Sequence, residues 1–395
     1  MGKFIPLCIP NFEGNERKYV DDAVDQGWVS TGGAYITKLE EEMARFLNVD
    51  EVSACQSGTS ALHLALIESG VLPGDMVIVP TLTFIAAVNP VKYQFAEPLF
   101  MDCDDSLCMD PIKLKKFCDE ECEFIDGKLL HRITGKHIKA IIVVHVFGNL
   151  ADMENIMEVA EKYNLKVIED ATEALGSKYT EGKFAEKHAG TIADFGAYSY
   201  NGNKIITTGG GGALTAKSAD TVKHIRYLST QCKDDSHYYI HNEVGFNYRM
   251  TNVQAAIGVA QMEELPEFIL RKQKNYELYK ELFKGFELGE MMDFRAGTFS
   301  NKWFYSLKIN KVKVSATMRE IIMTLEKRGV GTRAIWGLIH EQLPYKDSLT
   351  YKIEKATNYS SCILNLPSST NIAKDDIKYV VEQIKLTLRE FANGR

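Results

Sequence analysis

The sequence lacks any segment long and apolar enough to cross a membrane as a helix. Its longest dense apolar run, residues 138–147, has about half of the ~20 residues that a membrane-spanning helix requires. Near the N-terminus, Pro6 and Pro10 interrupt what little apolar character there is, and no charged segment precedes a long apolar one. We therefore expect a soluble, cytoplasmic protein without a membrane partner.

Neither the charge nor the cysteines indicate nucleic-acid or metal binding. The net charge is −7, and no run of basic residues offsets it. The eight cysteines form no C-x-x-C pair, and the Cys118/Cys122 spacing has no partner cluster downstream. We expect reduced thiols, no metal ion and no nucleic-acid partner.

Two common nucleotide-binding motifs are also absent. No G-x-G-x-x-G follows a predicted strand, and no G-x-x-x-x-G-K-[ST] occurs. The sequence shows no internal repeat and no low-complexity segment. Dinucleotide-binding and P-loop functions are therefore disfavoured.

What the sequence does contain is typical of a two-domain α/β protein. Its 395 residues are too many for one ordinary core. Strands alternate with helices over residues 52–216, which predicts parallel βαβ units. Pro266 and a long charged helix at 267–283 then suggest a link, so we expect a large domain at 1–265 and a smaller one at 266–395.

The local patterns predict individual elements. Apolar spacing or composition indicates helices at 13–26, 35–47, 81–88, 111–121, 153–163, 255–265, 317–328 and 375–391, and strands at 76–80, 98–102, 138–147, 166–172, 195–200, 213–216 and 303–309. We interpret the polar segment 104–139 as a stretch of chain that leaves the α/β core and returns to it.

A single lysine follows a tight turn near the middle of the chain. The turn formers Asn201, Gly202 and Asn203 carry the chain off a predicted strand to Lys204, and four glycines occupy 209–212. A Schiff-base lysine must meet a carbonyl held close to the backbone, which glycine permits. Taken alone, however, a loop lysine such as Lys204 is far more often simply solvated.

An acidic residue at a strand end strengthens the Schiff-base hypothesis. Asp170 lies at the carboxyl end of the strand predicted at 166–172, where ligands bind in open α/β sheets. Pyridoxal phosphate enzymes pair such a lysine with an Asp that keeps the pyridine nitrogen protonated. A helix N-cap is the alternative role for Asp170.

Other strand ends offer weaker candidates. Small residues around Gly58 and Thr59 open a helix and could bind a phosphate, or simply cap the helix. Phe84 follows a strand and could stack on a planar ring or belong to the core. His145 could contact a cofactor or be a satisfied core histidine.

Seven motifs, in order along nearly the whole chain, carry a family resemblance. They are G-W-V-S-T-G-G, S-G-T-S-A-L-H, P-T-L-T-F-I-A, E-D-A-T-E-A-L-G, S-Y-N-G-N-K-I-I-T-T-G-G-G-G, G-F-N-Y-R-M-T-N-V-Q-A-A-I-G and N-L-P-S-S-T. The chain resembles the sugar aminotransferases of the DegT/DnrJ/EryC1/StrS type, which act on nucleotide-linked keto-sugars. The resemblance implies the fold-type I, aspartate-aminotransferase-like fold: a mainly parallel large-domain sheet and a smaller C-terminal α/β domain.

The resemblance also implies roles for cofactor-binding residues. Lys204 would bind pyridoxal 5′-phosphate as a Schiff base and later move a proton, while Asp170 would pair with the pyridine nitrogen. Phe84 would stack on the ring, and Glu173 stands where the family often has Gln or His near the phenolic oxygen. The phosphate would be bound by Gly58, Thr59 and Ser199 and, from the neighbouring subunit, by Asn247, which makes a homodimer the smallest active unit.

The substrates follow from the same resemblance. L-glutamate would donate the amino group and leave as 2-oxoglutarate, and a nucleotide-linked keto-sugar would accept it. For the diphosphate we consider Arg226, Arg249 and Arg333, the last of which precedes Ala334 where the family often has Pro. The remaining substrate-binding candidates lie in the C-terminal part: Trp303, Trp336 and His340.

The N-G-N-K-I-I-T-T-G-G-G-G form and an H-R-I-T-G-K insertion resemble one branch of the family most. That branch makes 4-amino sugars for legionaminic acid and bacillosamine-type pathways, which implies a UDP-linked 2-acetamido-4-keto-2,6-dideoxyhexose. Amination at C3, or of a dTDP- or GDP-linked keto-sugar, is the enzyme alternative. A non-catalytic binding or regulatory protein is opposed by Lys204 and Asp170, and relatives that instead remove a hydroxyl carry His at the lysine position.

Overall fold

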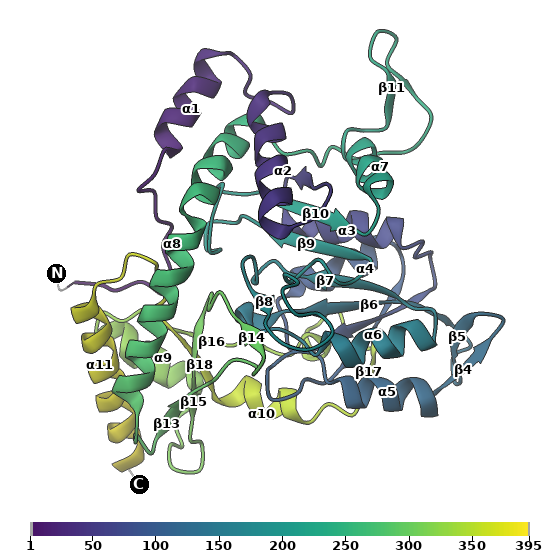
Figure 1. The fold of residues 1–395 in the computed structure, drawn as a ribbon. Helices are drawn as coiled ribbons and strands as arrows, with labels where there is room; N and C mark the ends of the chain where they lie inside the picture. Colours follow the sequence, from purple (N-terminus) through teal and green to yellow (C-terminus); the bar gives the residue numbers. More distant parts are fainter. Residues whose placement is uncertain (1–2, 394–395) are drawn as a thin grey trace.

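The computed structural model of the chain describes residues 3–393, in which two sheets are joined by one long helix (Figure 1). The main sheet has ten strands: β1 (Ser53–Cys55), β2 (Met76–Pro80), β3 (Glu97–Met101), β4 (Cys122–Ile125), β5 (Lys128–His131), β6 (His137–Val144), β7 (Lys166–Asp170), β9 (Phe195–Ser199), β10 (Gly212–Ala216) and β17 (Leu349–Tyr351). Its order is β1-β10-β9-β7-β6-β2-β3-β17, and the hairpin β4–β5 pairs with β6.

Most neighbouring strands of this sheet are parallel, as the alternation of strands and helices predicted. From β9 to β17 every neighbouring pair runs in the same direction. Strand β10 runs antiparallel to both β9 and β1, and the chain reaches it by turning straight back from β9 through the Lys204 turn and the glycines. The hairpin strand β5 is also antiparallel to its neighbours β4 and β6. The prediction of parallel units throughout 52–216 is therefore wrong for β10, and the hairpin β4–β5 was not predicted.

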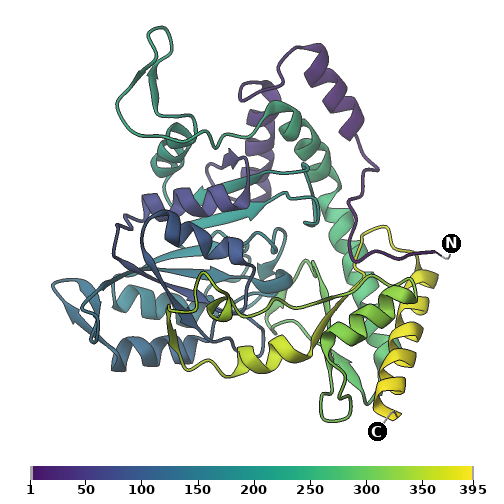
Figure 2. The same cartoon turned by 180° about the vertical axis from the view of Figure 1, so that it is seen from behind.

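Helices cover both faces of the main sheet (Figures 1 and 2). The helices of this part of the chain are α1 (Glu16–Asp25), α2 (Ala34–Leu47), α3 (Gly58–Glu68), η1 (Ile85–Ala87), α4 (Asn89–Tyr93), α5 (Pro111–Glu120), η2 (Val146–Gly148), α6 (Met153–Lys162) and α7 (Ala219–Ser229). The helix predicted at 81–88 is only the short 3-10 helix η1, because residues 81–84 form an irregular loop after β2.

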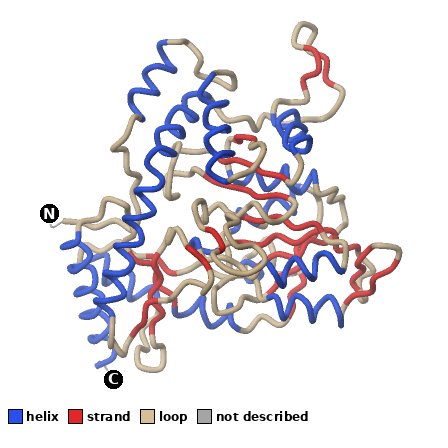
Figure 3. Tube along the Cα trace, viewed as in Figure 1, coloured by secondary structure: helices blue, strands red, loops and turns tan. Residues whose placement is uncertain are grey.

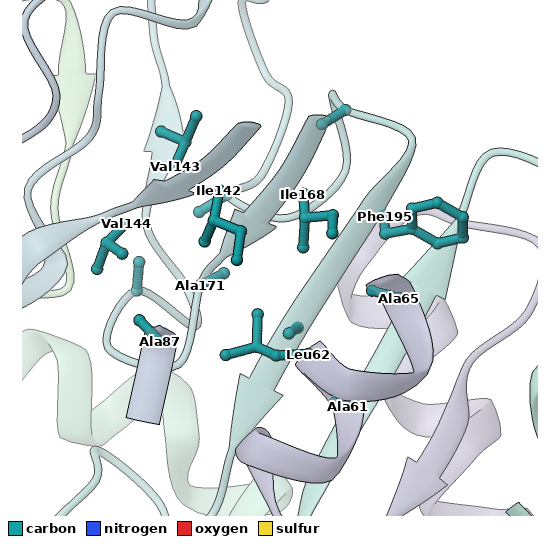
Figure 4. Packing of buried hydrophobic residues seen from close by; sticks show 14 of the residues in the cluster. Ala61, Leu62, Ala65, Ala87, Ile142, Val143, Val144, Ile168, Ala171 and Phe195 are labelled. Atoms are coloured by element: carbon teal, nitrogen blue, oxygen red, sulfur yellow. The ribbon is translucent and has the colours of Figure 1, made fainter. Parts of the chain in front are cut away.

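Helix α3 is buried on nearly all sides and packs on the main sheet. Figure 4 shows Ala61, Leu62 and Ala65 of α3 facing Ile168 of β7 and Phe195 of β9. All five side chains are buried in the main core. This packing brings the first turn of α3 to the same end of the sheet as the carboxyl ends of β7 and β9.

The second sheet is antiparallel and has its own core. Its order is β13 (Gly289–Met291), β15 (Tyr305–Ile309), β18 (Ile363–Leu366) and β16 (Arg333–Ala334). The helices of this part are α9 (Met318–Lys327), η3 (Ile339–Glu341), α10 (Lys355–Cys362) and α11 (Lys374–Asn393). Two small two-stranded sheets complete the fold: β8 (Lys178–Tyr179) with β14 (Thr298–Phe299), and β11 (Lys233–Asp235) with β12 (Ile240–His241). The β11–β12 hairpin projects from the body (Figure 3).

A single helix, α8 (Asn252–Phe283), connects the two cores (Figure 1). It continues through Pro266, although a proline removes one helical hydrogen bond. Leu265 and Phe268 belong to the main core, and Tyr276 and Tyr279 to the second. The sequence predicted a break at Pro266; instead both halves of one helix are held by apolar packing.

The chain crosses between the two cores more than once. Strand β17 extends the main sheet beside β3, although it follows the second sheet's β15 and β16 in the chain. Near the N-terminus, Ile5 pairs with Val330 and packs into the second core. None of the helices described here is long and apolar enough to span a membrane.

Candidate active site

The Lys204 side chain lies in a mostly enclosed position at the carboxyl ends of β7 and β9. Its amide donates to the carbonyl of Asn201 at 2.9 Å, which closes the turn predicted from the sequence. Its Nζ lies 3.5 Å from Glu173 Oε1 and 4.3 Å from the centre of the Trp303 ring, and the side chain is 13% exposed. An amine that is shielded from water but bound by only one carboxylate is well placed to act as a nucleophile.

Glu173 is a fully buried carboxyl group that faces this amine. Its second oxygen, Oε2, accepts the Phe147 amide at 2.8 Å. Burial raises the pKa of Glu173 to about 7, although the Lys204 ammonium opposes that shift. Near neutral pH, Glu173 can therefore hold or release a proton 3.5 Å from the lysine nitrogen.

Asp170 closes strand β7 beside these two groups. It is 3% exposed, and Oδ1 accepts the Thr172 amide at 3.1 Å. Burial raises the pKa of Asp170, while the hydrogen bonds from Thr172 and the Lys204 charge act in the opposite direction. A cation beside Asp170 would stabilise its charged form and offset much of the free-energy cost of burying that charge.

The first turn of α3 approaches the same region and can bind an anion. Ser57 caps the helix by accepting the Ser60 amide at 3.0 Å, and Gly58 and Thr59 supply the first two helical N–H groups, which have no acceptor within a helix. A Cβ on Gly58 would lie 2.9 Å from the Ser199 Cβ and equally close to the Thr172 methyl. Glycine at position 58 thus allows the helix N-terminus to reach Ser199.

Phe84 lies in the loop after β2 and is 56% exposed, so it is not a core residue in this chain. The same loop is bound to the C-terminal part. Thr81 accepts the Ile339 amide at 3.0 Å through its carbonyl, and its hydroxyl lies 2.6 Å from His340 Nδ1. His340, a predicted substrate contact, therefore also anchors the Phe84 loop.

His145 is satisfied within the core. Its Nε2 donates to Glu169 Oε2 at 2.9 Å, and its Nδ1 accepts the Ala151 amide at 3.2 Å. Glu169 also accepts the amides of Gly190, Ile192 and Ala193. The polar atoms of His145 thus hold the loop that precedes β9, in agreement with the core alternative.

Two of the three arginines considered for a diphosphate are already paired inside the fold. The Arg249 guanidinium binds both oxygens of Glu40, and Arg226 Nη2 lies 3.6 Å from Glu40 Oε2. Glu40 is itself buried, so both cations balance a charge that the fold would otherwise leave unpaired. Arg249 and Arg226, which the sequence analysis considered for the diphosphate, are therefore both paired with carboxylates of the fold in this structure.

The remaining candidates lie farther out. Arg333, on β16, is exposed, and Trp336 packs against Phe147 with ring centres 4.7 Å apart and ring planes inclined by 35°. Asn247 is exposed in the segment that follows the protruding β11–β12 hairpin, where it pairs with Thr230. Within residues 3–393, Asn247 forms no hydrogen bond or ion pair with Lys204, Glu173 or Asp170 of its own chain, the three residues that we call the Lys204 group.

Sequence reasoning missed Asn301, a fully buried residue that holds the Lys204 group together. Its Nδ2 donates to the carbonyls of Glu173 and Leu175, and its Oδ1 accepts the Trp303 amide at 3.0 Å. One side chain thus links the loop of Glu173 to the ring that covers Lys204. Asn301 belongs to no motif and lies 97 positions after Lys204 in the printed sequence, so only the tertiary structure reveals it.

Together these residues fit pyridoxal phosphate. Lys204 provides the amine, Asp170 a buried carboxylate for the ring nitrogen, and the α3 N-terminus with Ser199 an anion site for the phosphate. A pyridinium nitrogen beside Asp170 would supply the cation that this buried carboxylate lacks. The exposed Phe84 ring is available for stacking on the cofactor.

Comparisons with known proteins agree with this geometry. The model of the DegT/DnrJ/EryC1/StrS aminotransferase family matches residues 10–385. The GDP-perosamine synthases of Caulobacter vibrioides and Escherichia coli O157:H7 are each 35% identical to this chain, over 97% of its length and 98% of theirs.

A solved structure shows the same fold over the whole chain. The Helicobacter pylori aminotransferase PseC, involved in the biosynthesis of pseudoaminic acid, superposes with a TM-score of 0.88 at 20% identity, over 98% of this chain and 100% of PseC. The chain therefore belongs to the DegT/DnrJ/EryC1/StrS aminotransferase family and is a pyridoxal phosphate-dependent sugar aminotransferase of nucleotide-sugar biosynthesis.

Proposed function

We propose that this enzyme transfers the amino group of L-glutamate to C4 of a UDP-linked 2-acetamido-4-keto-2,6-dideoxyhexose, for the synthesis of a legionaminic acid or bacillosamine-type sugar. The observation that carries the transaminase part is the buried Lys204 amine 3.5 Å from Glu173, with Asp170 beside them. The sugar is inferred from the resemblance of residues 201–212 and of the insertion at 131–136 to one branch of the family.

Each residue of the Lys204 group has a distinct task in this proposal. Bound pyridoxal phosphate supplies an electron sink for the carbon that loses or gains a proton. Lys204 would move that proton to and from the substrate carbon. Because it delivers the proton from one face only, it would set the configuration of the new amine. Glu173 holds a proton next to Lys204, and Asp170 keeps the ring nitrogen charged.

The insertion that suggests the branch lies at the opposite end of the main sheet from the Lys204 group. Residues 131–136 connect β5 to the start of β6, whereas the Lys204 group lies at the carboxyl ends of the strands. The eight residues of β6 separate the two ends by roughly 25 Å. The insertion therefore supports the proposal only as a marker of ancestry, and sugar recognition must come from other residues.

Trp336 and His340 are better placed for that recognition. Trp336 packs against Phe147, whose amide donates to Glu173, and His340 anchors the loop of Phe84. Both residues come from the C-terminal part and meet the Lys204 side of the main sheet. We propose them as the residues that contact the sugar or its nucleotide.

A GDP-linked keto-sugar is the second candidate acceptor. It is favoured by the two GDP-perosamine synthases at 35% identity. The test is a panel of UDP-, dTDP- and GDP-linked 4-keto-6-deoxy sugars, offered with L-glutamate and followed by mass spectrometry and NMR of the product. Faster amination of the GDP-linked sugar would reject the UDP proposal, and an amine at C3 would reject the assigned carbon.

We also propose a homodimer that shares its active sites. The support is Asn247, which is exposed here and which the family resemblance assigns to the phosphate of the neighbouring cofactor. Mixing inactive Lys204→Ala with inactive Asn247→Asp should restore activity, because one site of the mixed dimer would contain both native residues. If each variant is inactive alone and the mixture stays inactive after subunit exchange, the shared site is rejected.

A further inference from the structure

The S-G-T-S-A-L-H motif ends in His63, a histidine that is not part of the Lys204 group. His63 lies on α3, the helix whose first turn can bind an anion, and it is 6% exposed. Its Nδ1 lies 3.1 Å from the hydroxyl of Tyr248, and its Nε2 lies 2.7 Å from the amide nitrogen of Gln94. His63 therefore links α3 to the segment that contains Asn247.

These two contacts define where the His63 ring carries its proton. The Gln94 amide nitrogen can only donate, so Nε2 accepts, and Nδ1 carries the proton and donates to the Tyr248 oxygen. Burial lowers the pKa of His63, which keeps the ring neutral, as these hydrogen bonds require. The ring is thus fixed in one orientation between the end of α4 and the Asn247 segment.

Two aromatic rings of the Asn247 segment pack on His63. Phe246 and Tyr248 stack with ring centres 4.9 Å apart, and these centres lie 5.2 and 5.8 Å from the centre of the His63 ring. Side chains of an extended segment alternate between its two sides, so the residue between these rings faces away from His63. Accordingly, Asn247 is exposed, whereas Phe246 and Tyr248 are half-buried.

The backbone of the same segment is held on both sides. The amides of residues 246 and 248 donate to two carbonyls at the end of α7, at 2.7 and 2.9 Å. The Tyr248 carbonyl accepts the amide of Gln56, which directly precedes the Ser57 cap of α3, at 2.7 Å. The segment is thus fixed by α7, by α3 and by the His63 ring, and it presents Asn247 outward.

The Asn247 side chain has no role within its own chain. Within residues 3–393 it forms no hydrogen bond through its side chain. The stretch just before it leaves four large apolar side chains half or more exposed: Tyr238, Tyr239, Ile240 and Val244. Apolar groups gathered on an exposed surface mark a site where another protein molecule binds. This surface suits a second copy of the chain, as the shared active site requires.

We propose that His63 is a positioning residue for the active site of the neighbouring subunit rather than for its own. Through Phe246 and Tyr248 it holds Asn247 in the orientation that reaches the phosphate of the neighbouring cofactor. This role rests on the proposed homodimer with shared sites. Helix α3 then supports both sites, because its first turn binds the phosphate of its own subunit while its His63 serves that of the other.

Heterodimers in which only one chain keeps Lys204 test this role directly. Full-length chains with two different affinity tags are co-purified, and one of them carries Lys204→Ala, so the absorbance of the cofactor bound to Lys204 reports a single site. His63→Leu is then placed either on the chain with Lys204 or on the chain without it. Each apo heterodimer is titrated with pyridoxal 5′-phosphate to find the half-saturating concentration.

The two arrangements should give opposite results. With His63→Leu on the chain that lacks Lys204, the half-saturating concentration should rise by about three- to tenfold, as for one lost buried hydrogen bond. With His63→Leu on the chain that keeps Lys204, it should not change, because the neighbouring chain still presents Asn247 correctly.

Three further variants control the experiment. His131→Leu removes a buried histidine whose Nδ1 also contacts a hydroxyl, that of Thr134 at 2.9 Å, at the other end of the main sheet, and it should have no effect on either chain. His63→Asn keeps a donor near the Nδ1 position and should recover much of the affinity. Tyr248→Phe removes only the hydroxyl and should act as His63→Leu does, more weakly, which keeps the test valid if His63→Leu does not fold.

Asn247→Asp in the same two arrangements separates this proposal from the shared site on which it rests. We expect both Asn247→Asp and His63→Leu to weaken only the site of the other chain. If Asn247→Asp acts on the other chain but His63→Leu weakens its own site, both sites or neither, the role of His63 is overturned and the shared site stands. If Asn247→Asp does not weaken the site of the other chain, the shared site is rejected, and the role of His63 with it.

Discussion

Two lysines, Lys204 and Lys272, both contact Trp303, but their amines have different surroundings. Lys204 places its Nζ over the indole ring and is bound by a single carboxylate, Glu173, at 3.5 Å. Lys272, in α8, donates to the Trp303 carbonyl at 2.8 Å and also to the Ser368 carbonyl. One amine is available for chemistry, and the other is used to hold the fold.

The comparison shows that a shifted pKa does not by itself identify a catalytic lysine. Burial lowers the pKa of Lys272 to about 8, which would suit a nucleophile. However, Lys272 is 1% exposed and two backbone carbonyls occupy its N–H groups. Space and free hydrogen-bonding capacity around the nitrogen, rather than its pKa, separate the two residues.

The largest effect should come from Lys204→Ala. We expect kcat to fall by about 10²–10⁴-fold, since the proton carrier and the covalent link to the cofactor are both lost. The absorbance of the cofactor bound to the lysine should disappear as well. Lys217→Ala, at an exposed lysine, is the matched control and should retain both; comparable losses there would remove the distinction made for Lys204.

Asp170→Asn should have the next largest effect. The amide has the same size but cannot stabilise a charged ring nitrogen, so kcat should fall by about 10²-fold, as for other lost electrostatic contacts. Asp110→Asn, which changes a true helix cap, should keep kcat within about twofold. No helix follows Asp170 before β8, so the capping alternative does not apply, and equal effects of the two substitutions on kcat would contradict a specific role for Asp170 at the ring nitrogen.

Glu173→Gln should change how the stability of the apoprotein depends on pH. The pKa of Glu173 is higher in the folded state, about 7, than its ordinary value of 4.5, so the folded state binds more protons between these pH values. The free energy of unfolding should therefore fall as pH rises through this range, by up to about 3 kcal/mol at ~1.4 kcal/mol per pKa unit.

Urea unfolding of the two apoproteins at pH 5 and pH 8 measures that dependence. Because Gln does not titrate, the free energy of unfolding of the variant should decrease less between pH 5 and pH 8 than that of the wild type. An identical pH dependence in both proteins would contradict a raised pKa at Glu173. The loss of the Lys204 contact should lower the free energy of unfolding at both pH values.

Lys272→Met should affect stability far more than chemistry. Two buried carbonyls, of Trp303 and Ser368, would lose their donor, which costs about 1–3 kcal/mol each in the free energy of unfolding. Thermal and urea unfolding measure that loss. In the folded variant, the absorbance of the cofactor bound to Lys204 should remain. Its absence would mean that Lys272 is also needed to bind the cofactor.

Arg132→Ala should have the smallest effect. Arg132 lies in the insertion at the start of β6, where it pairs with Glu123, far from the Lys204 group. We expect kcat/KM for the keto-sugar to stay within about twofold of the wild type. A loss of tenfold or more would show that the insertion takes part in substrate recognition.

Much of the main sheet could be predicted from the sequence because its signals are local. Strand β2 has the bounds that its apolar run predicts, and α2 and α5 agree with theirs to within a residue. Strand β17 could not be foreseen, because three residues that are mostly exposed show no strand periodicity. The direction of β10 depends on how the glycine segment turns, which the alternation of helices and strands does not specify.

The candidate site divides in the same way. Asp170, Glu173 and Lys204 lie within 35 positions and belong to recognisable motifs, so their proximity could be predicted. The contacts of Asn301 and Lys272 join segments from distant parts of the chain, which no local pattern records. The sequence also gave no sign that Arg249 pairs with Glu40, which lies 209 positions away.

The most direct test of the account is to find which lysine carries the cofactor. The holoenzyme is reduced with borohydride, digested, and searched by mass spectrometry for the lysine that bears the pyridoxyl group. We predict a single labelled site at Lys204, absent when L-glutamate is added before reduction. A label at Lys272 or another lysine, or a Lys204 label that glutamate does not prevent, would contradict the central claim.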